Sequence, residues 1–389
     1  MLYNILNLTC MILTNCAACA APLGLALGKK CGRCSTRYCG PACQEQHWKG
    51  CGHDKLCKKI KKSGGAEQYH AEKKHAEAVA DAAEACAEDT KGQTCYICTE
   101  TVHWKTKEGL VRMYACRGTA GFAHVSCLAE QAKILVEEAE ENNLDGERSQ
   151  SRWLQWSTCS MCEQDHQGGV SCALGWACWK TYLGRPEADQ ARQLAMGVLG
   201  NGLRAAKKCE ECLIVFESQL NVLQRHWRTA STQVLSCKGN LATCYTNLGR
   251  LEAALVLERE VYSAQLTESG VGYETLTSGL NLSISLTDLK KYSEARTFTS
   301  ERAVDTIRVL GRDHDITLAL REQYAGILYE DDAASRGDVT EAVAVLGDVA
   351  TNRRRVFGSQ HPYTVNVLTF LERARMKCED ADAPETRLS

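Results

Sequence analysis

Motifs that carry chemistry on small molecules are missing from this sequence of 389 residues. It has no phosphate-binding loop, no dinucleotide fingerprint and no Ser, His and Asp constellation typical of hydrolases. It also lacks a long hydrophobic run, because the apolar residues 1–15 are too few and too rich in Asn and Thr to span a bilayer. They lack the basic region of a signal peptide, so we expect a disordered or docked tail and no membrane partner.

A strong excess of charge is missing too, since the net charge is −2. Cysteine, by contrast, is abundant and unevenly distributed: 18 of the 23 cysteines precede residue 180. Clustered Cys and His without an export signal indicate zinc binding in a reducing compartment rather than a disulfide scaffold. We therefore expect a cytoplasmic or nuclear protein of two or three domains.

Eight potential metal ligands lie in a segment too short to build a hydrophobic core of its own. They form four closely spaced pairs: Cys16 and Cys19, Cys31 and Cys34, Cys39 and Cys43, and His53 and Cys57. Two thiolates on a tight turn can reach one tetrahedral ion, and eight ligands suit two ions. Metal binding would then supply the folding free energy of this segment.

Together with Tyr38, Gln44 and Trp48, this spacing resembles a MYND zinc finger over residues 16–60. The resemblance implies two interleaved zinc sites. The first would use Cys16, Cys19, Cys39 and Cys43, and the second Cys31, Cys34, His53 and Cys57. The gap between Trp48 and His53 is longer than usual in the family, so Cys51 or His47 is an alternative ligand. MYND fingers often accompany SET domains, but no SET-like sequence is present here.

The same segment is basic, because residues 1–65 hold ten Lys and Arg but two acids, about +8. The densest run, Lys55 to Lys62, suits either a nucleic-acid contact or nuclear address, or a solvated helix edge. No aromatic residues interleave with the lysines, so nucleic acid is not an expected partner. Residues 61–91 follow as a linker, with an amphipathic helix over 66–88 and with His70 and His75 expected on its surface.

A second group of potential ligands is spread over residues 92–182: Cys95, Cys98, Cys116, His124, Cys127, Cys159 and Cys162. This pattern resembles a RING-CH finger. The resemblance assigns Cys95, Cys98, His124 and Cys127 to one zinc, and Cys116, Cys159 and Cys162 to another. The position of the missing fourth ligand holds Tyr114. Either Cys172, Cys178, His166 or His103 completes that site, or it is weak or empty. The whole chain would thus bind three to four zinc ions.

RING-type fingers recruit a ubiquitin-conjugating enzyme and orient its thioester without donating a catalytic residue of their own. The resemblance makes Ile97 the contact with that enzyme. Two departures from active family members are visible: no Trp follows Leu128, and Glu163 stands where a cation is usual. Four tryptophans flank the last Cys pair, at positions 153, 156, 176 and 179, and we interpret them as the core of the module.

From residue 187 to 378 helical periodicity dominates, and the pair Cys209 and Cys212 is expected in packing rather than metal binding. Related tetrapeptides begin at Leu251, Tyr292 and Val339, with periods of 41 and 47 residues, the longer one attributed to a loop at 331–338. A second set of markers, Thr275, Thr317 and Thr364, predicts two helices per repeat. The turns at His314 and His361, where we expect both histidines to act as caps, resemble kinesin light chain tetratricopeptide repeats.

These features predict a mainly α fold: two small zinc-stabilised modules followed by an α-helical repeat solenoid and a disordered tail at 379–389. Repeats of this kind bind peptide segments of other proteins. The leading hypothesis is a RING-type ubiquitin ligase that selects substrates through its repeats and MYND-like finger. The alternatives are a non-enzymatic adaptor or scaffold and, ranked last, a nucleic-acid-binding regulator.

Overall fold

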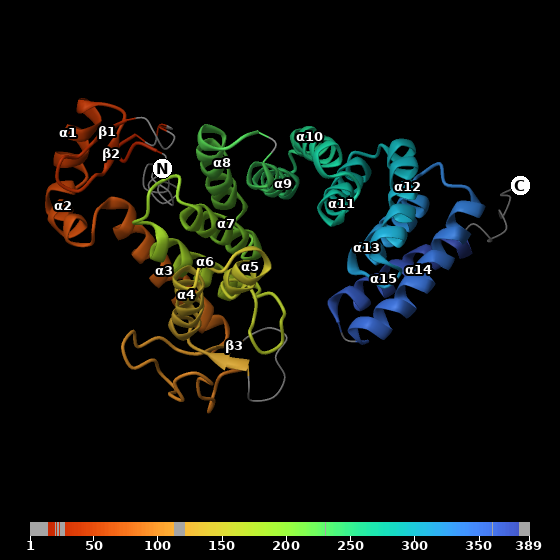
Figure 1. Cartoon of the computed structure of the whole chain (residues 1–389), viewed down its shortest axis with the longest axis horizontal. Coiled ribbons are helices and arrows are strands. Elements are labelled where there is room, and N and C mark those ends of the chain that lie inside the picture. Colours follow the sequence, from red (N-terminus) through yellow and green to blue (C-terminus); the bar gives the residue numbers. More distant parts are fainter. Residues whose placement is uncertain are drawn as a thin grey trace, which may run out of the picture. The chain divides into compact units, whose positions relative to one another are not determined.

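The computed structural model describes residues 15–19, 21, 23, 28–112, 121–229, 231–359 and 361–380 (Figure 1). Fifteen helices and four short strands form in these ranges, so the fold is mainly helical, as expected. The described residues gather into two compact units that divide between Arg228 and Thr229, and each is treated by itself below. The expected tails lie outside the described residues, apart from Asn15 and the two helical residues 379–380.

The first module of the first unit is a short hairpin followed by two helices. Strand β1 (Lys29–Lys30) pairs antiparallel with β2 (Arg37–Tyr38), and α1 (Pro41–Gly50) and α2 (His53–Lys62) follow. Its small core is built around Tyr38, Ile60 and cysteine side chains. Because so little apolar surface is buried, the positions of these elements depend on what holds the cysteines together.

Helix α3 (Ala66–Ala85) leads from this module to the next and buries Ala71, Ala78 and Ala82 on the predicted face. The expected surface position of His75 is wrong, because its side chain is 8% exposed and Nδ1 lies 3.0 Å from Lys180 Nζ. Lys180 belongs to α6 (Gly168–Tyr182), which packs along α3. His75 stands four residues after Ala71 and three before Ala78, so it lies on the same helix face as these alanines, and α6 covers that face.

The second module combines a hairpin with helices that surround a tryptophan core. Strand β3 (Val111–Arg112) pairs with β4 (Phe122–Ala123), and α4 (Val125–Glu141) and α5 (Gly146–Leu154) follow. Trp156, Trp176 and Trp179 are at most 2% exposed, which confirms them as core residues, whereas Trp153 is half-buried. This core joins the loops of the module to α6.

Helices α7 (Gln190–Ala205) and α8 (Cys209–His226) complete the first unit. Helix α7 packs closely on α6, and a Cβ atom at Gly202 would lie 2.4 Å from the carbonyl oxygen of Ser171. Only glycine therefore allows this approach of the two backbones. Cys212 of α8 has no exposed surface, in keeping with its expected packing role. Both helices lie within the range expected for the repeats, yet they belong to the first unit.

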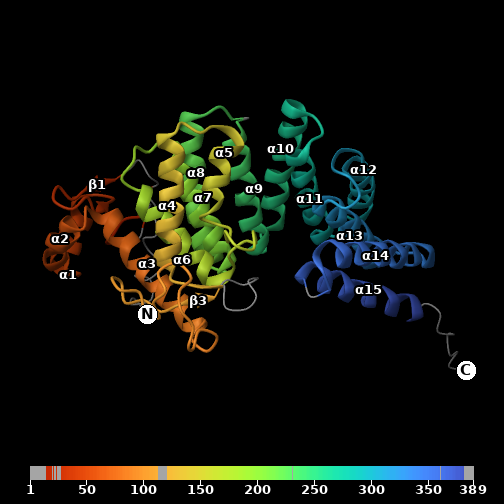
Figure 2. The same cartoon turned by 60° about the horizontal axis from the view of Figure 1, so that its bottom comes forward.

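The second unit consists of helices that pack in sequence order. They are α9 (Thr232–Asn247), α10 (Leu251–Ser269), α11 (Tyr273–Asp288), α12 (Tyr292–Leu310), α13 (Asp315–Glu330), α14 (Arg336–Phe357) and α15 (Pro362–Asp380). Each packs against its neighbour in sequence, as α14 and α15 do in both views (Figures 1 and 2). Three pairs and a final helix confirm the prediction of two helices per repeat.

The repeated residues hold these helices at close range. Ala254, Ala295 and Ala342 have no exposed surface, so a small side chain stands at each equivalent helix contact. At the turn before α13, His314 Nδ1 accepts a hydrogen bond from the backbone N–H of Ile316, which confirms its capping role. His361 Nδ1 lies in the equivalent relation to the N–H of Tyr363, at 3.3 Å.

The longer period before α14 arises differently from the prediction. The expected loop over 331–338 ends at Ser335, because a capping box between Ser335 and Asp338 begins the helix at Arg336. The connection from α13 to α14 therefore has five residues, where that from α11 to α12 has three. The remaining additional residues extend α14 to 22 residues, compared with 19 in α12.

Candidate metal centres

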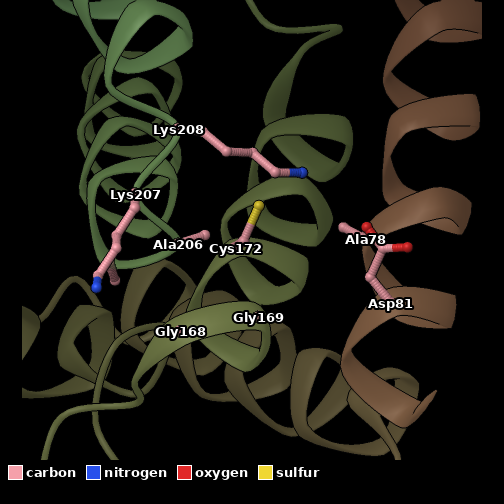
Figure 3. Close-up of a pocket in the computed structure, with 9 residues that line it drawn as sticks. Ala78, Asp81, Gly168, Gly169, Cys172, Ala206, Lys207 and Lys208 are labelled. Atoms are coloured by element: carbon pink, nitrogen blue, oxygen red, sulfur yellow. The ribbon is translucent and has the colours of Figure 1, made fainter. Parts of the chain in front are cut away.

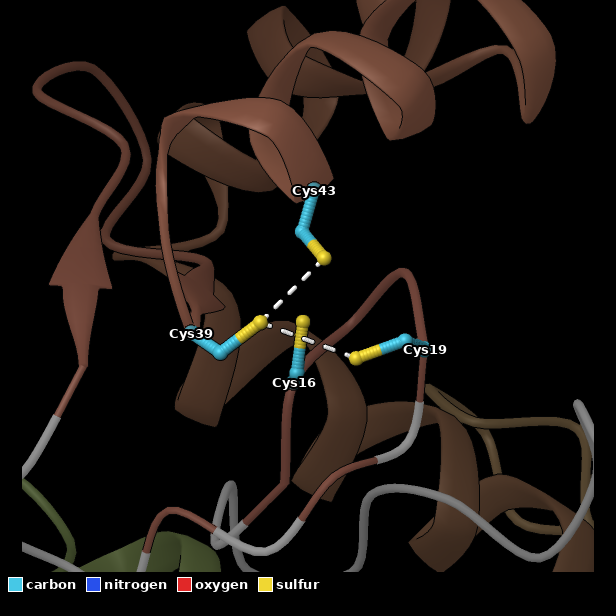
Figure 4. A group of neighbouring side chains, drawn as sticks. All are labelled: Cys16, Cys19, Cys39 and Cys43. Carbon is cyan, nitrogen blue, oxygen red and sulfur yellow. Dashed lines mark hydrogen bonds between the residues drawn. The ribbon is translucent and has the colours of Figure 1, made fainter.

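The first cluster unites Cys16 and Cys19, which lie on one turn, with Cys39, which precedes α1, and Cys43, in the first turn of α1. All four sulfur atoms lie within 4.8 Å of one another, and Figure 4 shows them pointing into one space. The sulfurs of Cys39 and Cys43 are 3.2 Å apart, and those of Cys19 and Cys39 are 3.6 Å apart. This is the set that the interleaved order predicts for the first MYND-like site.

The second cluster joins Cys31 and Cys34, on the turn between β1 and β2, to His53 and Cys57 of α2. The four potential ligand atoms again lie within 4.8 Å, and all four residues are buried. Cys34 Sγ lies 3.4 Å from His53 Nε2, and the Cys31 and Cys57 sulfurs are 3.8 Å apart. The tetrahedral ligand set Cys₃His is one that zinc commonly takes.

The alternative ligands of this module are not part of either cluster. His47 Nδ1 lies 2.9 Å from the Tyr38 hydroxyl, and its ring stacks on His53 with centroids 4.9 Å apart. Burial lowers the pKa of His47 to about 4, so the ring is neutral. Cys51 is exposed, and no group of three potential ligands among the described residues includes it.

The third cluster contains Cys95 and Cys98 on one turn, and His124 and Cys127 at the beginning of α4. Cys98 Sγ lies 3.3 Å from His124 Nδ1, and Cys127 Sγ lies 3.8 Å from the same nitrogen. His124 is the N-cap residue of α4, so the helix end fixes the positions of both ligands. These are the four residues that the RING-CH resemblance assigns to its first zinc.

The turns that begin with Cys31, Cys95 and Cys159 share one backbone geometry. In each, the first cysteine donates its N–H to the carbonyl five residues ahead and accepts from the N–H four residues ahead. The residue four positions after the first cysteine adopts a positive φ: 63° at Ser35, 64° at Thr99 and 56° at Glu163. The N–H groups of Ile97 and Met161 also point at Sγ of Cys95 and Cys159, each at 3.4 Å. Such turns present two sulfurs on one side.

The second RING-CH-like site is described only in part, because Tyr114 and Cys116 lie outside the described residues. Cys159 and Cys162 share the turn geometry, yet no third potential ligand joins them among the residues that the structure describes. The four alternatives, His103, His166, Cys172 and Cys178, are therefore not brought to this pair. Cys172 and Cys178 are buried on α6 instead.

Cys172 lines a cavity of about 360 Å³ between α3, α6 and the turn that joins α7 to α8. Figure 3 shows its thiol near the Lys208 side chain, with Asp81 of α3 across the cavity. Burial raises the pKa of the Cys172 thiol to about 11, so it stays protonated. The cavity holds no second potential soft ligand and has no features of a metal site.

The ionisation of the cysteines in the second cluster favours a bound cation. Burial opposes ionisation of Cys31, but His53 and the backbone of Arg33 lower the pKa of that thiol to about 6. Burial and then the neighbouring Cys34 and Cys31 raise the pKa of Cys57 to about 12. The Cys31 thiol therefore loses its proton readily, and the resulting negative charge opposes the loss of a proton from Cys57. A divalent metal removes this conflict, because it stabilises all the thiolates at once.

A fourth turn of the same geometry was not predicted. His103 donates its N–H to the Glu108 carbonyl and accepts from Lys107, whose φ is 60°. The Glu108 carboxylate accepts hydrogen bonds from the N–H and hydroxyl of Ser126, at 2.6 and 2.8 Å, and from the Thr106 hydroxyl. It thereby connects this turn to the end of α4 that carries His124 and Cys127. A search for Cys pairs misses this connection, since it contains no cysteine.

Comparisons with known proteins bear on the second unit. Residues 234–265, which span most of α9 and α10, match the family model for the tetratricopeptide repeat. A crystal structure of a putative kinesin light chain from Podosopora anserina is 18% identical, with 60% of this chain and 98% of that chain covered and a TM-score of 0.38. BtubC (BKLC) from P. vanneervenii is 14% identical, with coverages of 68% and 89% and a TM-score of 0.41.

Both TM-scores lie below 0.5, so the repeat assignment depends on the family match and on the helix pairs themselves. No curated protein matches the chain. The MYND and RING-CH resemblances remain predictions. None of the helices in the described part of the chain has the length and hydrophobicity that crossing a bilayer requires.

Proposed function

We propose that this protein is a zinc-dependent interaction scaffold, in which a MYND-like and a RING-CH-like module are joined to peptide-binding helical repeats. The proposal is supported chiefly by the three groups of four ligand atoms, each within 4.8 Å, two of which lie in a module with little other core. Three or four sulfurs with at most one imidazole suit zinc among the common metals.

The repeats supply a surface of the right kind for peptides. A cavity of about 270 Å³ opens on α11, α13 and α15, the first helices of successive pairs. Its lining mixes apolar side chains such as Leu280 and Phe370 with the polar groups of Gln323, Asn366 and Tyr329. Stacked helix pairs commonly hold extended or helical peptides on such a face, where the apolar groups provide affinity and the polar groups orientation.

Elemental analysis of the purified chain tests the metal proposal and is expected to give three zinc ions, or four if Cys116, Cys159 and Cys162 hold another. A value of one or none contradicts it.

Selection from a random peptide library tests the repeats. Selected peptides should lose affinity for the Phe370→Ala variant but not for Val365→Ala, whose side chain is exposed on the same helix but does not line the cavity. Equal loss in both variants contradicts the proposed groove.

A second candidate function is ubiquitin transfer by the RING-CH-like module. One observation favours it: Ile97 is 38% exposed at the tip of a turn whose first ligand, Cys95, is buried. The side chain is thus available to a conjugating enzyme without itself holding metal. Discharge of ubiquitin from a panel of conjugating enzymes should be lost in Ile97→Ala and retained in Val102→Ala, a neighbouring exposed apolar residue. If the zinc-loaded protein discharges no ubiquitin from any conjugating enzyme, the scaffold is the proposed function that remains.

A further inference from the structure

Helix α2 has two faces of opposite character. His53, Cys57 and Ile60 are buried and face the module, so this side contributes two of the candidate metal ligands. Four exposed lysines, at 55, 58, 59 and 62, are spaced by three or four residues and therefore share the opposite side. Since an α-helix rises about 1.5 Å per residue, these lysines form a stripe about 10 Å long.

This lysine stripe is not neutralised by the protein itself. Within the described residues, no carboxylate lies within ion-pair distance of Lys55, Lys58, Lys59 or Lys62. Other exposed lysines of the first unit do have such partners, as Lys49 has in Glu45 at 2.8 Å and Lys73 in Glu77 at 3.7 Å. The exposed Lys29 and Lys30 of β1 add to the positive charge of the module.

Bound metal would not cancel this charge. Seven thiolates and two divalent ions together add −3, so the +8 of residues 1–65 becomes about +5. The rest of the chain carries −10, because the whole chain carries −2. The net positive charge is therefore confined to one small module, and its field is screened beyond about 8 Å at physiological salt.

We propose that the lysine stripe of α2 is a docking surface for an acidic segment of a partner protein. Such a segment in a helix would place carboxylates at the same three- and four-residue spacing. Three observations favour a protein over nucleic acid. The isoelectric point of the chain is about 6.6, the stripe has no arginine to bind phosphate bidentately, and α2 has no exposed aromatic ring for a base to stack on.

Fluorescence anisotropy with the full, zinc-loaded chain tests the proposal. The probes are a labelled peptide of about twelve residues, half of them Glu, and a labelled DNA duplex of about equal length. The double variant Lys58→Glu with Lys62→Glu reverses charge on the stripe. Its matched control, Lys73→Glu with Lys91→Glu, changes the net charge equally at exposed lysines elsewhere in the unit. Zinc content is measured for every variant, so that loss of the fold is separated from loss of the surface.

We expect the acidic peptide to bind the wild type and the control, and to bind the stripe variant at least about tenfold more weakly. Binding should also weaken as salt is raised. Equal weakening in both variants would show a general charge effect and overturn the proposal. Tighter binding of the duplex than of the peptide, lost in the stripe variant, would replace the acidic protein with nucleic acid. Absence of peptide binding by protein with full zinc content would also overturn it.

Discussion

Half of the buried side chains in the core of the first module are cysteines: Cys16, Cys31, Cys34 and Cys57 among eight residues. The core shared by α13, α14 and α15 contains none, and is built from Leu, Val, Ala and one Tyr. With zinc bound as proposed, the first kind of core would gain its stability from the ion that joins the sulfurs, whereas the second gains it when apolar surface leaves water. The proposed zinc sites would thus give the first module a source of folding free energy different from that of α13, α14 and α15.

Removal of zinc by a chelator should produce the largest difference in stability between the N-terminal modules and the second unit. Structural zinc contributes about 10 kcal/mol or more in small finger peptides, so its removal should unfold residues 16–62 and the turns around Cys95 and Cys127. The second unit has no ligand cluster among its described residues and should stay folded. Limited proteolysis with and without chelator measures this, with cleavage expected first in the N-terminal modules. Loss of protection across residues 232–380 would break the comparison.

The converse experiment destabilises the second unit by a substitution in its helix contacts. Ala295→Trp inserts a large side chain where Ala295 has no exposed surface, and should cost about 3 kcal/mol or more by separating α12 from its neighbours. The zinc content should not change. Val304→Trp, at a 67% exposed position of the same helix, is the control and should change stability by less than about 0.5 kcal/mol. Urea unfolding measures both, and an unaffected midpoint in Ala295→Trp would show that this contact is misplaced.

The polar interior of the second unit predicts a pH dependence. Burial raises the pKa of Glu258 from 4.5 to about 7, although a hydrogen bond from Ser285 acts in the other direction and Asp288 adds to the rise. Because the folded state favours the protonated acid, the stability contribution is complete below pH 4.5 and is lost as the pH rises to about 7. The loss should be about 1–3 kcal/mol.

The variant Glu258→Gln isolates this effect, since metal binding changes with pH in the same way in both proteins. Its urea midpoint should exceed that of the wild type at pH 8 and approach it at pH 5. A difference that stays constant over this pH range would place the titrating group elsewhere.

The smallest expected effect concerns Glu108, which connects the His103 turn to α4. Glu108→Gln keeps one acceptor but cannot accept all three hydrogen bonds, and should lower zinc affinity of the third cluster by about tenfold. The first two clusters serve as internal controls, because Glu108 contacts neither. Competition with a chromogenic chelator measures the affinities, and cobalt absorption reports the geometry of the site. Equal weakening of all clusters would indicate general destabilisation instead.

The sequence was a reliable guide where function depends on spacing along the chain. The pairs Cys31 and Cys34 or Cys95 and Cys98 are recognisable because a tight turn needs a fixed number of residues. The alternation of small and apolar residues around Ala254 and Ala295 likewise indicated helix pairs, since each pair repeats the same local packing. The capping role of His314 followed from its place in the repeated turn.

Contacts between segments that are distant in sequence could not be predicted from spacing along the chain. His75 is buried because α6 covers it, and Glu108 holds α4 because the His103 turn brings the two together. Neither residue has a neighbour in sequence that indicates its partner. The length of the connection before α14 was also decided by a local cap, at Ser335, that competes with the repeat pattern.

The sequence by itself determined the ligand pairs, the helix periods and the division of charge, because these depend on residues within a few positions of one another. The spacing alone does not say which pairs converge; the family resemblances implied it, and only the tertiary structure brings the pairs together and leaves Cys159 and Cys162 without a third ligand among the described residues. It also decided that the lysines of α2 face solvent while His53 and Cys57 face inward. Convergence of this kind depends on the packing of whole elements, which no short segment encodes.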